Sequence, residues 1–298
     1  DEQHRFGVEQ RLSLIKKGSN DRHQVPHQLI ISATPIPRTL SMTLYGNLKL
    51  SILDELPPNR KPIITTILHT SKKDSLIARL KQALDRDEQV YWVCPLVDES
   101  ESMDQLQDVK TLYNELVNQF GVEKVGIVYG SMKSKEKMQT MNDFKSAKFS
   151  ILVATTVIEV GVDVPNASII IINNAERLGI SQLHQLRGRV GRGSKESYCV
   201  LLYSDNISRV GKMRLSLIRD SQDGFYLAEK DLEIRGAGDI LGKQQSGISS
   251  FATFDINEYY DNHERVFECA EQIKKTHPKI SAKIVDRWFN KRISYVDV

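Results

Sequence analysis

The fold is decided by residues 151–172, which read ILVATTVIEVGVDVPNASIIII. The runs 151–154 and 169–172 are aliphatic and of strand length, and a polar segment with one Gly and one Pro separates them. Short runs of β-branched residues between turn-forming residues are typical of buried strands. The stretch therefore predicts two buried strands joined by a polar connection.

Similar runs recur along the chain, with helical patterns between them. The further strand candidates are 29–31, 90–93, 125–129 and 198–203. Helical spacing is seen for Leu76, Leu80, Ala83 and Leu84, and again for Met138, Met141 and Phe144. Strands that alternate with helices indicate the α/β class, a parallel sheet covered by helices on both faces.

Prolines, glycines and a change of pattern along the sequence predict that the chain has four parts. Three prolines at 57, 58 and 62 make a rigid polar connector, and from about residue 207 the pattern becomes helical. Asp223 and Gly224 mark a turn, and the second helix is expected to end at Arg235 before Gly236. The predicted parts are 1–56, 57–205, a helical hairpin with its loop at 206–250, and a helical tail at 251–298. In the hairpin, Val210, Met213 and Leu217 form the predicted packing stripe.

Composition excludes several classes of protein. A chain of 298 residues with 40% hydrophobic residues can form more than one packed core, which excludes wholesale disorder. The net charge of +3 is too small to indicate a nucleic-acid partner by itself. Cys94, Cys199 and Cys269 show no Cys-x-x-Cys spacing, so neither a disulfide framework nor a zinc knuckle is expected. No apolar run approaches the length of a membrane span, and we expect a cytoplasmic protein without a membrane partner.

The sharpest chemical signal is QLRGRVGR at 185–192. If this segment is helical, Gln185, Arg189 and Arg192 lie at i, i+4 and i+7 on one face. Two guanidiniums that project together suit the charge that develops on a transferring phosphoryl group. The alternative is a basic solvated helix, but that would not require two glycines, each of which costs about 1 kcal/mol relative to Ala.

Three weaker signals accompany it. The chain begins with DEQH, whose adjacent carboxylates suit Mg²⁺ and water activation, and SAT at 32–34 follows a predicted strand. TTVIEVGVD at 155–163 supplies two hydroxyls that suit a phosphate backbone. Each signal alone has a bland explanation as a solvated chain end or a turn.

In this order and spacing, DEQH, SAT, TTVIEVGVD and QLRGRVGR resemble motifs II, III, V and VI of superfamily 2 helicases. Within that superfamily, DEQHRFGVEQR, SATPIPRTL and the segment from Asp231 to Gly247 resemble the RecG family of bacterial branched-DNA translocases. The hairpin and its loop resemble the TRG motif, which that family shares with the transcription-repair coupling factor Mfd. Mfd usually carries Glu where Gln3 stands, so Gln3 favours the RecG family.

The resemblance implies a complete second RecA-like helicase lobe, only the C-terminal end of the first, and then the hairpin and tail. It implies ATP and Mg²⁺ as cofactors, and branched double-stranded DNA, such as replication forks and Holliday junctions, as partner. Single-stranded DNA-binding protein is a candidate partner of an expected monomer that is bacterial and nucleoid-associated.

The implied roles fall on particular residues. Asp1 and Glu2 resemble the metal-binding and water-activating acids, and Gln185, Arg189 and Arg192 the arginine-finger motif. The residues that resemble nucleotide neighbours are Gly161 and Asp163, and those that resemble DNA-contacting or coupling residues are Ser32, Thr34, Thr155, Thr156, Arg214, Arg219, Arg235 and Gln245.

The sequence departs from a complete motor in one respect. It contains no Gly-x-x-x-x-Gly-Lys-Ser/Thr loop to hold the β and γ phosphates, and it begins with Asp1 rather than Met. We therefore expect a segment of a longer enzyme that does not hydrolyse ATP alone. Two other functions stay open, the motor of Mfd and a non-catalytic DNA-binding module. An upstream wedge domain would favour the RecG family, and a polymerase-binding domain would favour Mfd.

Overall fold

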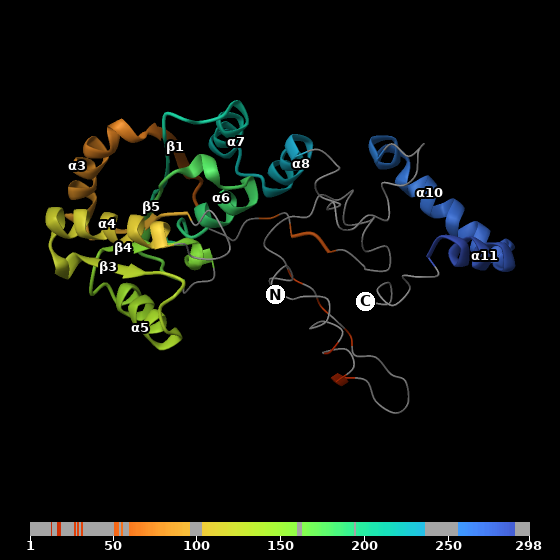
Figure 1. Cartoon of the computed structure of the whole chain (residues 1–298), viewed down its shortest axis with the longest axis horizontal. Helices are drawn as coiled ribbons and strands as arrows, with labels where there is room; N and C mark the ends of the chain where they lie inside the picture. The colour runs from red at the N-terminus through yellow and green to blue at the C-terminus, as the bar shows by residue number, and fades with distance from the viewer. Residues whose placement is uncertain are drawn as a thin grey trace. The chain divides into compact units, whose positions relative to one another are not determined.

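The structure of this chain is a computed structural model that describes residues 60–95, 103–159, 163–193, 195–235 and 256–289, with isolated positions before residue 56. The chain divides into two units (Figure 1), one of residues 50–234 and one of residues 1–49 with 235–298. The predicted division into four parts is a finer one and stays a prediction.

The first unit is built on a parallel sheet. Its six strands follow the order β1-β6-β5-β2-β4-β3, and every neighbouring pair is parallel. The strands are β1 (Ile63–His69), β2 (Gln89–Val93), β3 (Val125–Val128), β4 (Ile151–Ala154), β5 (Ala167–Ile172) and β6 (Ser197–Tyr203). The two strands predicted from residues 151–172 are therefore confirmed, and β2 lies between them in the sheet.

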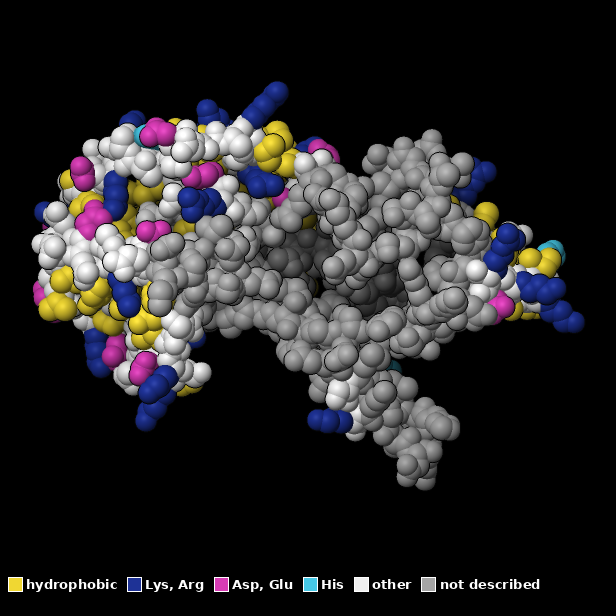
Figure 2. Space-filling view, viewed as in Figure 1, with side chains coloured by type: hydrophobic (Ala, Val, Ile, Leu, Met, Phe, Trp, Pro, Cys, Tyr) yellow, Lys and Arg dark blue, Asp and Glu magenta, His cyan; other side chains and the backbone are white. Residues whose placement is uncertain are grey.

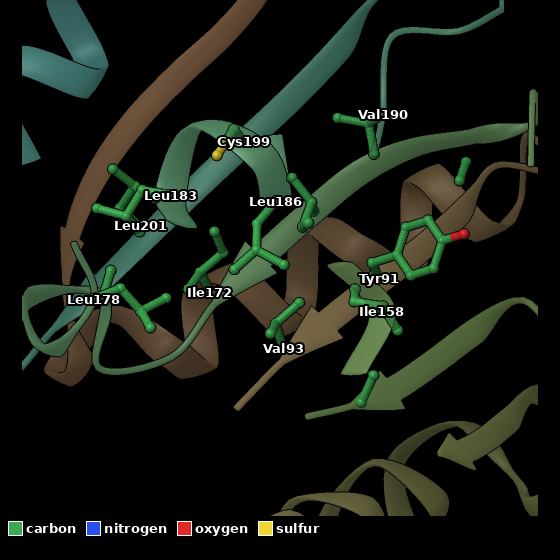
Figure 3. Close-up of a cluster of buried hydrophobic side chains, with 14 of the residues drawn as sticks. Tyr91, Val93, Ile158, Ile172, Leu178, Leu183, Leu186, Val190, Cys199 and Leu201 are labelled. Carbon is green, nitrogen blue, oxygen red and sulfur yellow. The ribbon is translucent and has the colours of Figure 1, made fainter. Parts of the chain in front are cut away.

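Helices cover both faces of this sheet, as predicted. They are α3 (Lys73–Leu84), α4 (Met103–Phe120), α5 (Ser134–Lys145), α6 (Ile180–Arg187), α7 (Arg209–Asp220) and α8 (Gly224–Arg235), with short 3-10 helices η2 (Thr70–Lys72), η3 (Val122–Lys124), η4 (Thr156–Glu159) and η5 (Ala175–Arg177). One core packs α3 and α4 against Trp92 and its neighbours. The other packs α5, α6 and α7 against Tyr91 and its neighbours (Figure 3). Two cores on opposite faces are the physical basis of the α/β class.

Two helical stripes were predicted correctly only in part. Met138 is 65% exposed, and α5 buries only Met141 and Phe144. On α7, Val210 and Met213 are 41% and 46% exposed, whereas Gly211, Leu215 and Ile218 form the buried face. The buried face of α7 meets β1, η5 and α6 rather than its hairpin partner alone. Spacing shows that a helix has an apolar side, but the element it packs against decides which side is buried.

Other boundaries agree with the sequence or add to it. The second hairpin helix, α8, ends at Arg235 as expected. Two elements were not anticipated, the edge strand β1 with its two threonines and the 18-residue helix α4. The three cysteines are free, and burial raises the pKa of both Cys94 and Cys199 to about 12.

In the second unit the structure describes two helices, α10 (Ile256–Thr276) and α11 (Pro278–Phe289), which contact each other. Pro278 begins α11 because proline suits the first turn of a helix. In this part of Figure 2, Lys and Arg side chains stand beside exposed apolar ones, which include Ile273, Ile280 and Ile284. On the first unit the same view shows both charge signs interspersed.

Candidate functional site

The two candidate finger arginines lie on a loop, not on a helix. Helix α6 ends at Arg187, and the backbone N–H of Gly188 donates to the carbonyl of His184 at 3.0 Å. Arg189 and Arg192 follow on residues 188–193, which we call the finger loop, while Gln185 stays on α6. The predicted i, i+4, i+7 face is therefore wrong beyond Gln185. The helix ends at Gly188, which is still right-handed, and the chain continues through i→i−3 turns at Arg189 and Val190 before a left-handed glycine redirects it.

That glycine is Gly191, whose φ is +77°. A Cβ at this position would lie 2.9 Å from Cγ1 of Ile63, the first residue of β1. Both the backbone angle and the close approach require glycine here. The second glycine of the motif thus seats the finger loop against the start of the edge strand.

Arg192 is held by two contacts. Its Nε donates to the carbonyl of Gly188 at 3.2 Å, and its Nη1 lies 3.2 Å from Oδ1 of Asp163. The fold thereby joins two predicted site residues that are 29 positions apart. The side chains stay 35% and 55% exposed, so solvent screens the pair and a competing anion can reach the guanidinium.

Arg189 lies near Arg192 and Asp163, because the charges of all three affect the pKa of one buried phenol, that of Tyr91. Burial raises the pKa of Tyr91 to about 12, while the two arginines lower it and the aspartate raises it. Figure 3 shows the Tyr91 ring between Val190 and Ile158, with its hydroxyl directed away from the other labelled side chains. Tyr91 is 1% exposed and so is no stacking surface for bases.

A third arginine of the motif has a role that sequence reasoning missed. Arg187 is 2% exposed, and its Nη1 donates to the carbonyls of Ile218 at 2.5 Å and Ser221 at 2.8 Å. These carbonyls lie at the C-terminal end of α7, where helix carbonyls lack intrahelical partners. Burial lowers the pKa of Arg187. The only signal in the sequence was one more arginine in an arginine-rich motif, which resembled a solvated charge.

His184 is a neutral partner of this arginine. Its Nδ1 lies 3.0 Å from Nη2 of Arg187, which has only protons to donate, so Nδ1 accepts. Burial, then Arg187 and then Arg60, lower the pKa of His184 to about 4, against an opposing effect of Asp223. His184 therefore carries no charge near neutral pH and holds the guanidinium in place.

The two threonines after β4 differ in access. Thr155 is fully buried, and within the described part of the chain its Oγ1 has no hydrogen-bond partner. Thr156 begins η4 and is half-buried. A DNA contact through Thr155 would require η4 to move, whereas Thr156 is accessible as it stands. Both assignments stay predictions.

The hairpin arginines also differ from one another. Arg219 is exposed, and its Nε lies 2.7 Å from Oδ1 of Asp220. Arg214 is half-buried on α7, and Arg235 is the last residue of α8. No contact of Arg214 or Arg219 with the finger loop is among the described hydrogen bonds; the described bonds between α6 and the hairpin come from Arg187.

Several predicted residues lie outside the described part of the chain. They are Asp1, Glu2, Ser32, Thr34, Gly161 and Gln245. Within the described residues there is no group of three or more His, Cys, Asp or Glu side chains that could hold a metal ion. Among the helices described, none is both long and apolar enough to span a membrane.

Comparisons with known proteins show which family the chain resembles. The helicase conserved C-terminal domain matches residues 72–194, which include Asp163, Arg189 and Arg192. A protein of Pasteurella multocida named ATP-dependent DNA helicase RecG is 48% identical over 100% of this chain and 43% of its own length. The proteins of that name in Escherichia coli K12 and Bacillus subtilis are 48% and 46% identical, over 97% and 91% of this chain and 41% and 38% of theirs.

A solved structure, RecG bound to a three-way DNA junction, is also similar. It has 34% sequence identity and a TM-score of 0.68, and the match covers 89% of this chain and 32% of that one. The chain thus spans less than half the length of these relatives. The resemblance found in motifs II, III, V and VI is confirmed, because the whole of this chain is similar in sequence to part of the RecG helicases.

Proposed function

We propose that this chain supplies the second motor lobe of an ATP-dependent translocase that acts on branched double-stranded DNA. The observation that carries the proposal is the pair of Arg192 and Asp163, which joins two separate motifs of a helicase domain, with Arg189 on the same loop as Arg192. Two arginines on one loop, of which Arg192 is partly exposed, suit phosphoryl transfer, where catalysis is mainly positioning and charge stabilisation.

The chain's own residues have distinct tasks in this proposal. Arg189 and Arg192 stabilise the negative charge that develops on the γ-phosphoryl oxygens, and Asp163 orients Arg192 until a phosphate competes for it. Arg187 and His184 hold the end of α6 from which the finger loop begins. When bound, ATP supplies the phosphoryl group whose transfer to water drives movement.

DNA as the substrate is supported by the relatives. The printed names are those of DNA helicases, and the similar structure is bound to a three-way DNA junction. We extend this to replication forks and Holliday junctions, and so to recombination and repair. Thr156 offers a hydroxyl to a phosphate backbone at the end of β4.

The remaining features of the proposal rest on the resemblance alone. Mg²⁺ would be held by Asp1 and Glu2, which suit it as adjacent carboxylates. Single-stranded DNA-binding protein as a partner, a monomeric state and a location with the bacterial nucleoid complete the proposal. Gln3 and the 48% identity to RecG proteins favour this function over the Mfd motor.

The test uses the full-length protein that contains this chain. ATP turnover is measured with a three-way junction and with a linear duplex of equal nucleotide content, together with strand displacement on the junction. We expect turnover to be stimulated more by the junction. Stimulation without displacement would favour a motor with another task, and absence of turnover on every DNA would favour a non-catalytic binding module.

A further inference from the structure

The turn between α7 and α8, residues 221–223, is hydrogen-bonded to the residue at the N-terminal end of the finger loop. Arg187 directly precedes the loop, and its guanidinium binds the carbonyl of Ser221 in the turn and that of Ile218 just before it. Because this guanidinium is buried, water cannot replace these carbonyls as its partners, and breaking the hydrogen bonds would cost free energy. The start of the finger loop and the turn of the hairpin therefore move together.

Two further hydrogen bonds join the same turn to the sheet. Oε1 of Gln222 accepts from the backbone N–H of Ile63 at 3.1 Å, and its Nε2 donates to the carbonyl of Ile63 at 3.3 Å. Strand β1 is an edge strand, so these backbone groups face the open side of the sheet. The amide pairs with β1 as one residue of a further strand would. A carboxamide side chain carries an acceptor and a donor side by side, so it can bind both backbone groups of one residue.

Ile63 links Gln222 to the C-terminal end of the finger loop, because it contacts both Gln222 and Gly191. Its side chain is buried, and it lies in the space that a Cβ on Gly191 would occupy. The residue after Gly191 is Arg192, which pairs with Asp163. Three residues before Ile63 is Arg60, whose pKa is lowered by burial and by the charge of Arg192. The start of β1 is thus in contact with the end of the loop that bears the fingers.

We infer that the hairpin turn holds the finger loop at both ends, and that Gln222 is a positioning residue that places Arg192 through Ile63 and Gly191. Displacement of the hairpin then changes the finger geometry directly, without passing through the sheet core. The effect on ATP turnover rests on the proposed function. The effect on the finger loop does not.

The direct test is hydrogen–deuterium exchange on this chain. Gln222→Ala should speed exchange of the backbone amides of residues 188–193, none of which Gln222 touches. The matched control is Asn173→Ala, which removes another amide side chain, one that accepts from Nε1 of Trp92 at 2.9 Å on the opposite core. The control should lower the thermal midpoint at least as much and leave exchange in the finger loop unchanged. Unchanged exchange in Gln222→Ala, or equal change in both variants, would overturn the inference.

A second variant examines the two-sided hydrogen bond. Gln222→Glu keeps an acceptor for the N–H of Ile63 but has no proton for its carbonyl near neutral pH. It should resemble Gln222→Ala in the finger loop. Exchange like that of the unaltered chain would show that the donor side is unnecessary and would contradict the positioning role assigned to the amide.

The functional arm uses the full-length protein. Gln222→Ala should lower kcat for ATP by about 10-fold, since small misplacements of a catalytic group are costly, and leave KM within about two-fold. Asn173→Ala should leave both near those of the unaltered protein. If exchange changes but the unaltered protein has no ATPase activity, the inference stands and the proposed function fails. If exchange changes while kcat equals that of the control, Gln222 does not position Arg192.

Discussion

Arg192 and Asp163 form an ion pair at 3.2 Å between the finger loop and the segment before β5. The pair is partly exposed, so we expect it to add at most about 1 kcal/mol to stability. Its main effect is to orient the guanidinium of Arg192. It fixes one of the two candidate fingers in the absence of nucleotide, and a phosphate would have to replace the carboxylate.

Asp163→Asn should therefore separate orientation from stability. We expect the free energy of unfolding to change by less than about 1 kcal/mol, and ATP turnover of the full-length protein to fall by about 10-fold. Chemical denaturation and steady-state turnover on the same preparation measure both. A large loss of stability with normal turnover would assign the pair a structural role only.

Arg187→Leu should destabilise the chain strongly. The change leaves the carbonyls of Ile218 and Ser221 without their donor, and unpaired buried acceptors cost about 1–3 kcal/mol each. The measurement is the midpoint of thermal or urea unfolding. Arg219→Ala, an exposed arginine on α7, is the control and should change stability by less than about 0.5 kcal/mol. Similar losses in the two variants would contradict a buried anchor at Arg187.

The low pKa of His184 predicts a pH dependence of stability. The imidazole titrates near 4 in the folded chain and near 6.5 when unfolded, so the unfolded state binds more protons between these values. Stability should be complete above pH 6.5 and should fall as the pH drops toward 4, by at most about 3 kcal/mol from this group. The groups that face it are Arg187, Arg60 and Asp223.

The control for that titration is His184→Asn, whose Oδ1 can still accept from Arg187 and cannot be protonated in this range. The difference in unfolding free energy between the two proteins should be constant above pH 6.5 and shrink below it. A constant difference from pH 4 to pH 8 would mean that His184 is not buried as a neutral ring.

Gln245 is predicted to belong to the lever that converts nucleotide-driven closure into duplex movement, a role carried by its resemblance to the TRG loop. In the full-length protein, Gln245→Ala should leave ATP turnover on branched DNA largely intact and impair strand displacement. Both are measured on one preparation. Equal loss of the two activities would place Gln245 in the ATPase or DNA site, and no loss would leave it a surface amide.

The sequence predicted the elements whose cause is local. Runs such as 151–154 become strands because aliphatic β-branched side chains fill both faces of a covered sheet, and α8 ends at Arg235 where Gly236 follows. The resemblance to the helicase motifs also named Arg192 and Asp163 as site residues, and the structure brings these two together.

What could not be predicted depends on contacts distant in the sequence. The path of the finger loop after the helix depends on the close approach of Gly191 to Ile63, which is 128 positions earlier. The buried side of α7 is the one that meets α6 and β1, so Val210 and Met213 are exposed although they fit a helical stripe. In the sequence Arg187 looks like a surface charge, and only the fold brings the carbonyls of Ile218 and Ser221 to its guanidinium.

The central claim is that Arg189 and Arg192 act on the transferring phosphoryl group. The most direct measurement is single-turnover ATP hydrolysis by the full-length protein on a three-way junction, with ATP affinity measured in parallel, for Arg189→Ala and Arg192→Ala. The account predicts a loss of about 10³-fold or more in the rate for each variant, with much smaller changes in affinity. Hydrolysis within a few-fold of the unaltered protein would contradict it.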